Sequence, residues 1–249
     1  MLEKINLHDI KNIALKASKV IMEIYKKDFQ VEYKDDKSPL TEADLKANEI
    51  ICNSLKNLYP NIPIMSEENK QTDYDIRKNW EYYWCIDPID GTKEFVKKND
   101  EFTVNIALIH NQEPVLGVVY APAIEVMYSA KKGAGAFKNT QKLPIKRDDN
   151  KYIIVASKSH MSQETQEYID KIKTTKEKEL TSMGSSLKLC LVADGSADCY
   201  PRVAPTMEWD TAAADAIVRE SGKMTYNFET HKPLSYNKVE LLNPNFVVK

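Results

Sequence analysis

The stretch "WCIDPIDGTKEF", residues 84 to 95, places Asp87 and Asp90 three positions apart where a strand-like run ends. Pro88 fixes its own φ, and Gly91 permits a backbone twist that is closed to most other residues. Two interpretations are open at this point. The residues form a turn and nothing more, or the turn directs both carboxylates toward one point, where they would hold a metal ion.

Three further acidic positions stand near the ends of expected strands or the starts of expected helices: Asp44 in "SPLTEAD", Glu67 in "MSEE" and Asp210 in "EWD". Two of them have a purely structural alternative. Asp44 lies three residues after Thr41 and could complete a capping box, and Asp210 could be the N-cap of the helical run that follows it. Together with the Ile89 carbonyl, the acids would instead form an oxygen-only site that suits Mg²⁺ better than zinc. Carboxylates this close repel one another strongly unless a cation neutralises them.

The bulk properties of the chain exclude several classes of protein. Its 249 residues carry a formal net charge of −2, which gives no electrostatic reason to expect nucleic-acid binding. No apolar run reaches the roughly 20 residues of a membrane-spanning helix, and the start, "MLEKINLHDIKNIALK", lacks the compact apolar region of a signal peptide. The 4 cysteines lack paired spacing, which favours reduced, buried thiols. We therefore expect a cytoplasmic protein, with peripheral attachment at the inner membrane face as an alternative.

The first half of the chain combines two helices with a set of strands. Helical spacing of apolar residues predicts helices over residues 7–27 and 42–59. The β-branched or alternating runs that follow predict strands in "YYWCID", "FTVNIALIH", "PVLGVVYAPA" and "VMYSAKK". Turn residues separate the last three of these runs, so we expect them to pair antiparallel.

The second half alternates strands with helices, a pattern typical of α/β structure. It begins after the polar stretch "LPIKRDDNK", and the helices are expected over residues 163–173, 186–193 and 211–221. The lysine-rich residues 171–178 predict a solvated helix end. We expect a combined α/β and α+β fold in two closely packed parts, residues 1–145 with most of the acidic positions and residues 146–249.

The order of the acidic motifs carries a resemblance to a known family. "DPIDGT", with "SEE" upstream and "WD" downstream, resembles the inositol monophosphatase and fructose-bisphosphatase superfamily of Mg²⁺-dependent, lithium-sensitive phosphatases. The resemblance covers essentially the whole chain and implies a layered αβαβα sandwich. It implies two or three Mg²⁺ ions, with Asp87 bridging two of them, and metal ligands at Glu67, Asp87, Ile89 through its carbonyl, Asp90 and Asp210.

The same resemblance implies the residues that act on the attacking water. A threonine after the Asp-Gly pair and an acid on the second helix orient this water in the family, and their positions here are Thr92 and Asp44. The implied catalytic set is therefore Asp44, Glu67, Asp87 and Thr92. The chain has no GxxxxGK[ST] loop, HExxH motif or GxSxG elbow, so the motifs of rival chemistries are missing.

Later residues favour a substrate with more than one phosphate. Residues 184–186 stand at an expected helix start, where free N–H groups attract anions, and Lys188 and Arg202 follow. A helix lysine is usually a solvated surface charge, so this signal is weak alone. However, "TSMGSSLKLC" and "YPRVAPTMEWD" resemble the 3′(2′),5′-bisphosphate nucleotidases. This resemblance implies substrate-binding roles for Gly91, Thr92, His160, Ser185, Lys188, Arg202 and Asp210.

The expected function is hydrolysis of the 3′-phosphate of adenosine 3′,5′-bisphosphate, giving AMP and phosphate, with the related sulfated nucleotide as a second substrate. This activity would belong to sulfur metabolism, in a monomer or a homodimer. One alternative is an inositol monophosphatase or broad sugar-phosphate phosphatase, and another is a non-catalytic binding protein on the same scaffold. The chain departs from the nucleotidase pattern at Asp100, where a glycine is expected.

Overall fold

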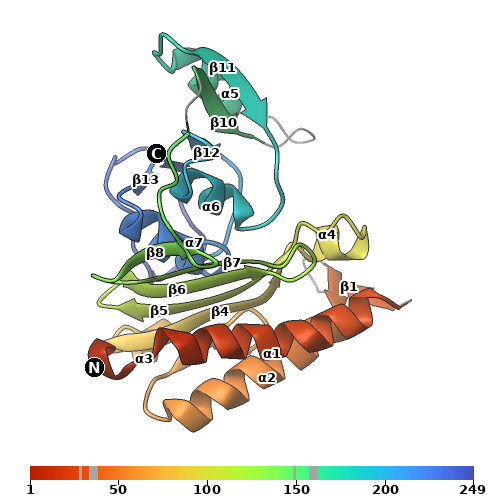
Figure 1. Ribbon diagram of the computed structural model, residues 1–249. Coiled ribbons are helices and arrows are strands. Elements are labelled where there is room, and N and C mark those ends of the chain that lie inside the picture. Colours follow the sequence, from red (N-terminus) through yellow and green to blue (C-terminus); the bar gives the residue numbers. More distant parts are fainter. Residues whose placement is uncertain (28–29, 34–38, 148–149, 157–161) are drawn as a thin grey trace.

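A seven-stranded mixed sheet occupies the centre of the first half (Figure 1). The computed structural model describes residues 1–27, 30–33, 39–147, 150–156 and 162–249. Strands follow the chain order β3 to β9, with β3 parallel to β4 and the other neighbours antiparallel. The strands are β3 (Ile64–Ser66), β4 (Tyr82–Asp90), β5 (Thr103–His110), β6 (Glu113–Ala121), β7 (Val126–Lys131), β8 (Gly135–Lys138) and β9 (Gln141–Lys142). The antiparallel set predicted from the sequence is confirmed.

The two faces of this sheet are covered by different helices because side chains alternate along each strand. On β5, Val104 and Ile106 pack in the hydrophobic cluster that includes α1 (Leu7–Tyr25) and α2 (Glu42–Leu58). Ala107 points to the opposite face and packs in the cluster formed with α6 (Leu187–Ala193) and α7 (Glu208–Glu220). The central sheet is therefore buried on both faces.

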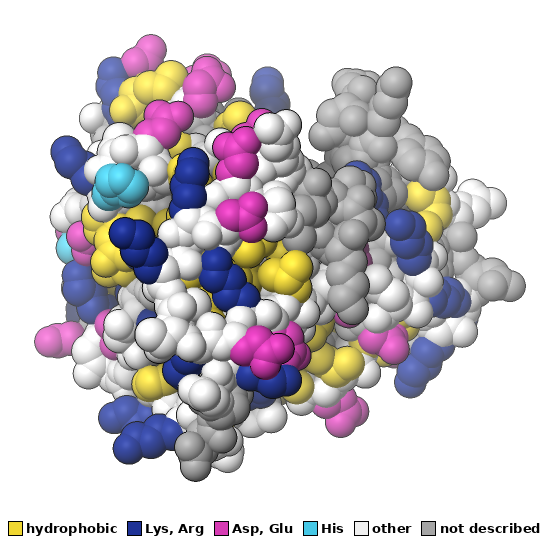
Figure 2. Space-filling model, turned by 90° about the horizontal axis from the view of Figure 1, so that it is seen from above, with side chains coloured by type: hydrophobic (Ala, Val, Ile, Leu, Met, Phe, Trp, Pro, Cys, Tyr) yellow, Lys and Arg dark blue, Asp and Glu magenta, His cyan; other side chains and the backbone are white. Residues whose placement is uncertain are grey.

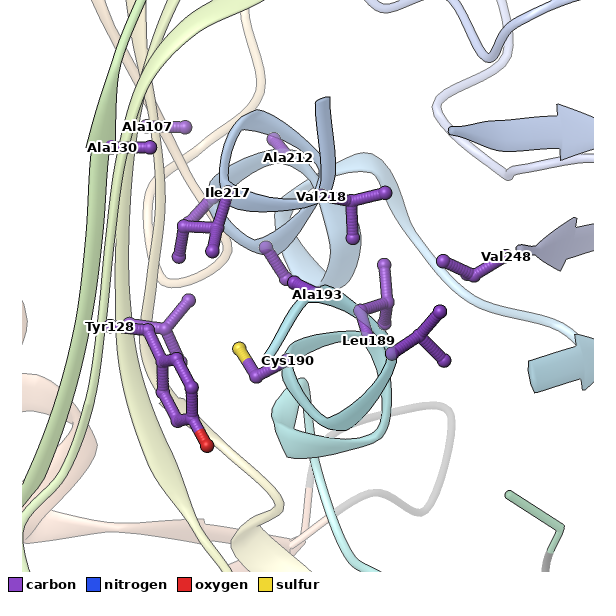
Figure 3. Close-up of a cluster of buried hydrophobic side chains, with 14 of the residues drawn as sticks. Ala107, Tyr128, Ala130, Leu189, Cys190, Ala193, Ala212, Ile217, Val218 and Val248 are labelled. Atoms are coloured by element: carbon purple, nitrogen blue, oxygen red, sulfur yellow. The ribbon is translucent and has the colours of Figure 1, made fainter. Parts of the chain in front are cut away.

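The second half adds two smaller sheets around α6 (Leu187–Ala193) and α7 (Glu208–Glu220). Figure 3 shows Leu189 and Cys190 of α6 and Ile217 and Val218 of α7 between the central sheet and Val248. Farther out, α5 (Gln163–Lys171) lies beside a parallel pair of strands (Figure 1). The layers alternate αβαβα, as predicted. The strands of the small sheets are β10 (Lys151–Val155), β11 (Glu177–Thr181), β12 (Tyr200–Arg202), β13 (Thr225–Asn227) and β14 (Phe246–Val248).

Short elements complete the described chain. They are a 3-10 helix, η1 (Leu2–Lys4), the antiparallel pair β1 (Val31–Tyr33) and β2 (Pro39–Thr41), and the helices α3 (Tyr74–Arg77) and α4 (Thr92–Val96). The polar stretch "LPIKRDDNK" follows β9 and runs into β10. The division at residues 145 and 146 stays a prediction.

Some predicted element boundaries are wrong. The lysine-rich stretch is not a solvated helix end throughout, because α5 ends at Lys171 and β11 begins at Glu177. Most side chains of β11 are exposed, so the strand has no apolar alternation that the sequence could reveal. Helix α7 begins at Glu208, three residues before the expected start at Thr211.

Asp100 shows how the chain tolerates the absence of an expected glycine. Its φ of 68° lies in the left-handed region that glycine enters most readily. The hydroxyl of Tyr25 donates to the Asp100 carboxylate at 2.8 Å and accepts from its main-chain N–H at 3.2 Å. These contacts hold the left-handed conformation and join the end of α1 to the loop before β5.

The cysteines and the surface agree with parts of the sequence-based picture. All four cysteines, Cys52, Cys85, Cys190 and Cys199, are free and buried. Among the described helices, none is both long enough and apolar enough to cross a membrane. On the face shown in Figure 2, acidic and basic side chains are interspersed.

The contact between β6 and α7 depends on Gly117. A Cβ atom at this position would lie 2.1 Å from the main-chain carbonyl oxygen of Ala213. We predict that Gly117→Ala lowers the free energy of unfolding by about 3 kcal/mol, because the helix must move away from the sheet. Gly222→Ala is the control, since nothing lies within 4 Å of its Cβ position and only its φ of 84° is unfavourable. Urea denaturation measures both variants, and equal losses would contradict the packing argument.

Candidate active site

Three acidic side chains from distant parts of the sequence converge at one end of the central sheet. Glu67 follows β3, Asp87 lies in β4, and Asp210 lies in the first turn of α7. Each offers one carboxylate oxygen, and these oxygens all lie within 4.8 Å of one another. The parallel pairing of β3 with β4 places Glu67 beside Asp87, since the Glu67 N–H donates to the Ile86 carbonyl at 3.1 Å.

Burial and mutual repulsion make this cluster unfavourable for negative charge. Asp87 is 1% exposed, and burial raises its pKa well above the usual value, with further increases from Glu67, Asp90 and Asp210. Burial likewise raises the pKa of Asp210, and the charge of Asp90 adds to the effect. A divalent cation would offset this repulsion. The donors are all carboxylate oxygens, so the residues fit the Mg²⁺ that the family resemblance implies.

The turn after Asp87 adopts the geometry that its glycine predicts. Gly91 has a φ of 90°, and the Ile89 N–H donates to the Asp87 carboxylate at 3.0 Å. Thr92 is the first residue of α4, and its hydroxyl lies 3.2 Å from the Ile89 carbonyl oxygen. The pairing of β4 with β5 also shifts register between Asp87 and Asp90, so the strand is irregular at this turn. The turn therefore exists, and its Ile89 N–H contacts one acid of the cluster.

Asp90 lies outside the cluster of three carboxylates that the described residues form. Its Oδ2 atom accepts hydrogen bonds from the Ser186 N–H at 2.5 Å and from the Ser186 hydroxyl at 2.7 Å. The side-chain amide of Asn105 lies 3.3 Å from the same oxygen. Burial raises the pKa of Asp90, while Lys188 and the Ser186 hydrogen bonds oppose this rise.

Asp44 has both of the interactions between which the sequence left a choice. Its Oδ2 accepts from the Thr41 N–H at 2.8 Å and from the Thr41 hydroxyl at 2.6 Å, which forms the predicted capping box of α2. Its Oδ1 lies 3.4 Å from the hydroxyl of Thr92. One carboxylate oxygen thus caps the helix while the other faces the threonine.

Asp210 is not the N-cap of its helix, so that structural alternative is wrong. The N-cap is Met207, and Asp210 is the third residue of α7. Its Oδ2 accepts from the Met207 N–H at 2.8 Å, which fixes the carboxylate at the helix start. The neighbouring Glu208 is fully buried and accepts from the Asn237 N–H at 2.7 Å, which anchors the same turn.

The structure also contains a polar group behind Glu67 that sequence reasoning missed. Asn48 lies on α2 one turn after Asp44. Its Oδ1 accepts from the Ser66 hydroxyl at 2.7 Å, and its Nδ2 donates to Asn69 at 2.9 Å. Asn48 thus binds one residue just before Glu67 and one residue two positions after it. The spacing of Asp44 and Asn48, four residues apart on a half-buried helix, was the available signal.

Several predicted substrate residues gather next to the acids. The Cβ of Ser185 would lie 3.3 Å from a Cβ built on Gly91, and Ser185 has a φ of 49°. Burial lowers the pKa of Lys188, and the charge of Asp90 opposes this decrease. Lys188 is therefore not the solvated surface lysine of the structural alternative. His160 lies outside the described residues.

Two of these predicted groups have contacts that limit their role. The Ser186 N–H donates to Asp90, so it is not one of the free helix-start donors that the sequence suggested. Arg202 donates to the Pro205 carbonyl at 3.2 Å through one guanidinium nitrogen. Burial lowers the pKa of Lys188 and the charge of Arg202 adds to this decrease, whereas burial raises the pKa of Asp210 and the charge of Arg202 opposes this rise. The three groups therefore lie within electrostatic range.

Known proteins resemble this chain over nearly its full length. The "3′(2′),5′-bisphosphate nucleotidase CysQ" of Shigella flexneri is 45% identical over 248 residues, covering 97% of this chain and 98% of that protein. The crystal structure of CysQ from Bacteroides thetaiotaomicron, titled a bacterial member of the inositol monophosphatase family, is 44% identical. It superposes with a TM-score of 0.88 and covers 98% of this chain and 96% of that one.

A more distant enzyme has the same fold. The Thermotoga maritima IMPase is 27% identical and superposes with a TM-score of 0.76 over 96% of this chain and 89% of that one. The model of the inositol monophosphatase family matches residues 1–246. The match spans both halves of the chain and includes every acidic position described above. The chain therefore belongs to the inositol monophosphatase family.

Proposed function

We propose that this chain is a Mg²⁺-dependent 3′(2′),5′-bisphosphate nucleotidase. It would hydrolyse the 3′-phosphate of adenosine 3′,5′-bisphosphate to AMP and phosphate, and the sulfated nucleotide would be a second substrate. The observation that carries this proposal is the convergence of three carboxylates beside the cationic side chains of Lys188 and Arg202. The near full-length similarity to proteins named as such nucleotidases supports it.

The proposed ligands for two or three Mg²⁺ ions are the side chains of four acids and the main-chain carbonyl of Ile89. The four acids are Glu67, Asp87, Asp90 and Asp210. When bound, Mg²⁺ supplies a Lewis acid that lowers the pKa of water and stabilises charge on the leaving oxygen. Burial first, and then repulsion by the neighbouring carboxylates, raise the pKa of Asp87, and a bound cation would offset both effects. The family resemblance implies that two of these ions would share Asp87, which is also the most buried of the three clustered acids.

Thr92 and Asp44 are the proposed pair that orients the attacking water. The Thr92 hydroxyl can donate its single proton to Asp44 at 3.4 Å or to the Ile89 carbonyl at 3.2 Å. In either case the lone pairs of Thr92 stay available to accept a hydrogen bond from water. Asp44 is held in place by its contacts with Thr41, so one of the two acceptors of the Thr92 hydroxyl has a fixed position.

Charge and shape support the proposed substrate groups. Lys188 and Arg202 would bind phosphate oxygens, Arg202 with its fork of donors and Lys188 as a point charge. Gly91, Thr92, Ser185 and Asp210 would line the space between the acids and these cations. Ser185 and Gly91 approach closely, which supports a shared surface. His160 keeps its proposed role from the family resemblance alone.

We also infer that the protein works in the cytoplasm, as a monomer or a homodimer, with peripheral attachment to the inner membrane face as the alternative location. The four free, buried cysteines support a reducing compartment.

The substrate assignment can be tested by phosphate release. With Mg²⁺ present, we predict a higher kcat/KM for adenosine 3′,5′-bisphosphate than for inositol 1-phosphate or fructose 1,6-bisphosphate, and inhibition by Li⁺. Compared with inositol 1-phosphate, the nucleotide has a second phosphate group, which gives Lys188 and Arg202 an additional charged partner. Fructose 1,6-bisphosphate tests whether a second phosphate group alone is sufficient. A preference for inositol 1-phosphate would contradict the nucleotidase assignment, and no release from any ester would indicate a binding protein.

The bridging role of Asp87 predicts opposite effects on activity and on metal-free stability. Asp87→Asn should abolish turnover, because the bridge loses its charge. In the metal-free protein, the raised pKa of Asp87 means that its ionisation destabilises the fold as pH rises above the unfolded value of 3.8. The variant should therefore have a higher Tm than wild type at pH 7 in EDTA.

Mg²⁺ should then raise the Tm of wild type much more than that of Asp87→Asn. Phosphate release and thermal unfolding, each with EDTA or Mg²⁺, measure these effects. Glu42→Gln, which removes an exposed carboxylate from the surface of α2, serves as the control. Mg²⁺-dependent turnover by Asp87→Asn at the wild-type rate would refute the bridging role.

Thr92 allows a separate test of water orientation. Thr92→Val retains the shape of the side chain and removes the hydroxyl, so we predict a loss of kcat of about 10²-fold or more. Thr92→Ser keeps the hydroxyl and should retain most of the activity. Steady-state kinetics at saturating Mg²⁺ compares the two variants. Equal kcat values for Thr92→Val and wild type would show that the hydroxyl does not act on the water.

A further inference from the structure

Ser186 connects two elements that carry proposed metal ligands. It lies at the start of α6 and is 1% exposed. Its N–H and hydroxyl both contact Oδ2 of Asp90, at 2.5 and 2.7 Å. The same hydroxyl oxygen lies 2.5 Å from the main-chain carbonyl of Asp210. One side chain thus joins the end of β4 to the first turn of α7.

Asn105 supports Ser186 from the central sheet. It is fully buried on β5, opposite Asp87 in the β4–β5 register. Its side-chain Nδ2 donates to the Ser186 hydroxyl oxygen at 2.8 Å and lies 3.3 Å from Asp90 Oδ2. The amide therefore holds the serine oxygen in place and contributes a further donor toward Asp90.

The donor protons of Ser186 show how it acts on Asp90 and Asp210. The Ser186 hydroxyl has one proton and two nearby acceptors, Asp90 Oδ2 and the Asp210 carbonyl, so it donates to one of them at a time. The Ser186 N–H donates to Asp90 in both cases. Asp90 Oδ2 therefore always has a donor, and the lone pairs of its other carboxylate oxygen stay available for a cation.

We propose that Ser186, held by Asn105, is a positioning residue for metal binding. Ser186 binds Asp90 Oδ2, so that Asp90 offers its other carboxylate oxygen to the metal. Ser186 also fixes the distance between Asp90 and the start of α7, where Asp210 lies. This inference rests on the metal site of the proposed function, because it assumes that Asp90 and Asp210 bind the same ion. Ser186 itself does not contact substrate or metal in this account.

A purely structural serine would behave differently. If Ser186 only joined α6 to the sheet, its loss would lower stability equally with and without Mg²⁺. If it positions Asp90, its loss must also weaken Mg²⁺ binding, because the main-chain N–H then holds Asp90 Oδ2 without the hydroxyl, and the link from Asp90 to the Asp210 carbonyl is lost. Residues that orient metal ligands in this way typically affect metal affinity by about 10- to 100-fold.

The test is a Mg²⁺ titration of Ser186→Ala by calorimetry, without nucleotide, together with thermal unfolding in EDTA. We expect the half-saturating Mg²⁺ concentration to increase about 10- to 100-fold for the ion that uses Asp90. Ser18→Ala is the matched control, because Ser18 on α1 is 3% exposed and its hydroxyl has no hydrogen-bond partner among the described atoms. The control should bind Mg²⁺ as wild type does.

Ser186→Cys provides a second variant if the alanine protein does not fold. Both variants keep the main-chain N–H, but only Ser186→Cys keeps a side-chain donor, a weak one, so its Mg²⁺ affinity should fall between wild type and Ser186→Ala. Unchanged Mg²⁺ affinity in the folded variants, with only a lower Tm in EDTA, would overturn the proposal. Weakened Mg²⁺ binding would support it even if the wild type released no phosphate from adenosine 3′,5′-bisphosphate, in which case only the nucleotidase function would fail.

Discussion

Repulsion between buried carboxylates is the constraint on which the proposed site depends. Glu67, Asp87 and Asp210 have carboxylate oxygens within 4.8 Å of one another. Burial and neighbouring negative charges raise the pKa of Asp87 well above its usual value. A fold that only needed stability would gain nothing from this arrangement. The cluster would become favourable if a cation bound there, so the repulsion between these carboxylates supports the proposed metal site.

The surrounding structure holds these acids at fixed positions against their repulsion. Parallel pairing of β3 with β4 sets Glu67 beside Asp87, and the close contact of α7 with β6 at Gly117 sets the height of Asp210 above the sheet. Ser186 then joins the Asp90 carboxylate to the Asp210 main chain. The two halves of the chain therefore meet at the acids, and small shifts between them would change the spacing of the ligands.

The sequence predicts the parts of this site that depend on local chemistry. The turn at Gly91 and the capping box at Asp44 follow from residue types and spacing, and both are confirmed. Asn105 and Ser186 could not be found in this way, because they are 81 residues apart and meet only in the folded chain. Strand β11 was missed for a different reason, since its exposed side chains leave no apolar pattern.

Anomalous diffraction from crystals soaked in Mn²⁺, which replaces Mg²⁺ at oxygen sites, tests the central claim most directly. The account predicts a strong anomalous peak about 2.1 Å from carboxylate oxygens of Glu67, Asp87 and Asp210. A further peak should have Asp210 and Asp90 as ligands, Asp90 through the oxygen that does not face Ser186. Crystals that bind Mn²⁺ only elsewhere, with the three carboxylates unchanged, would contradict it.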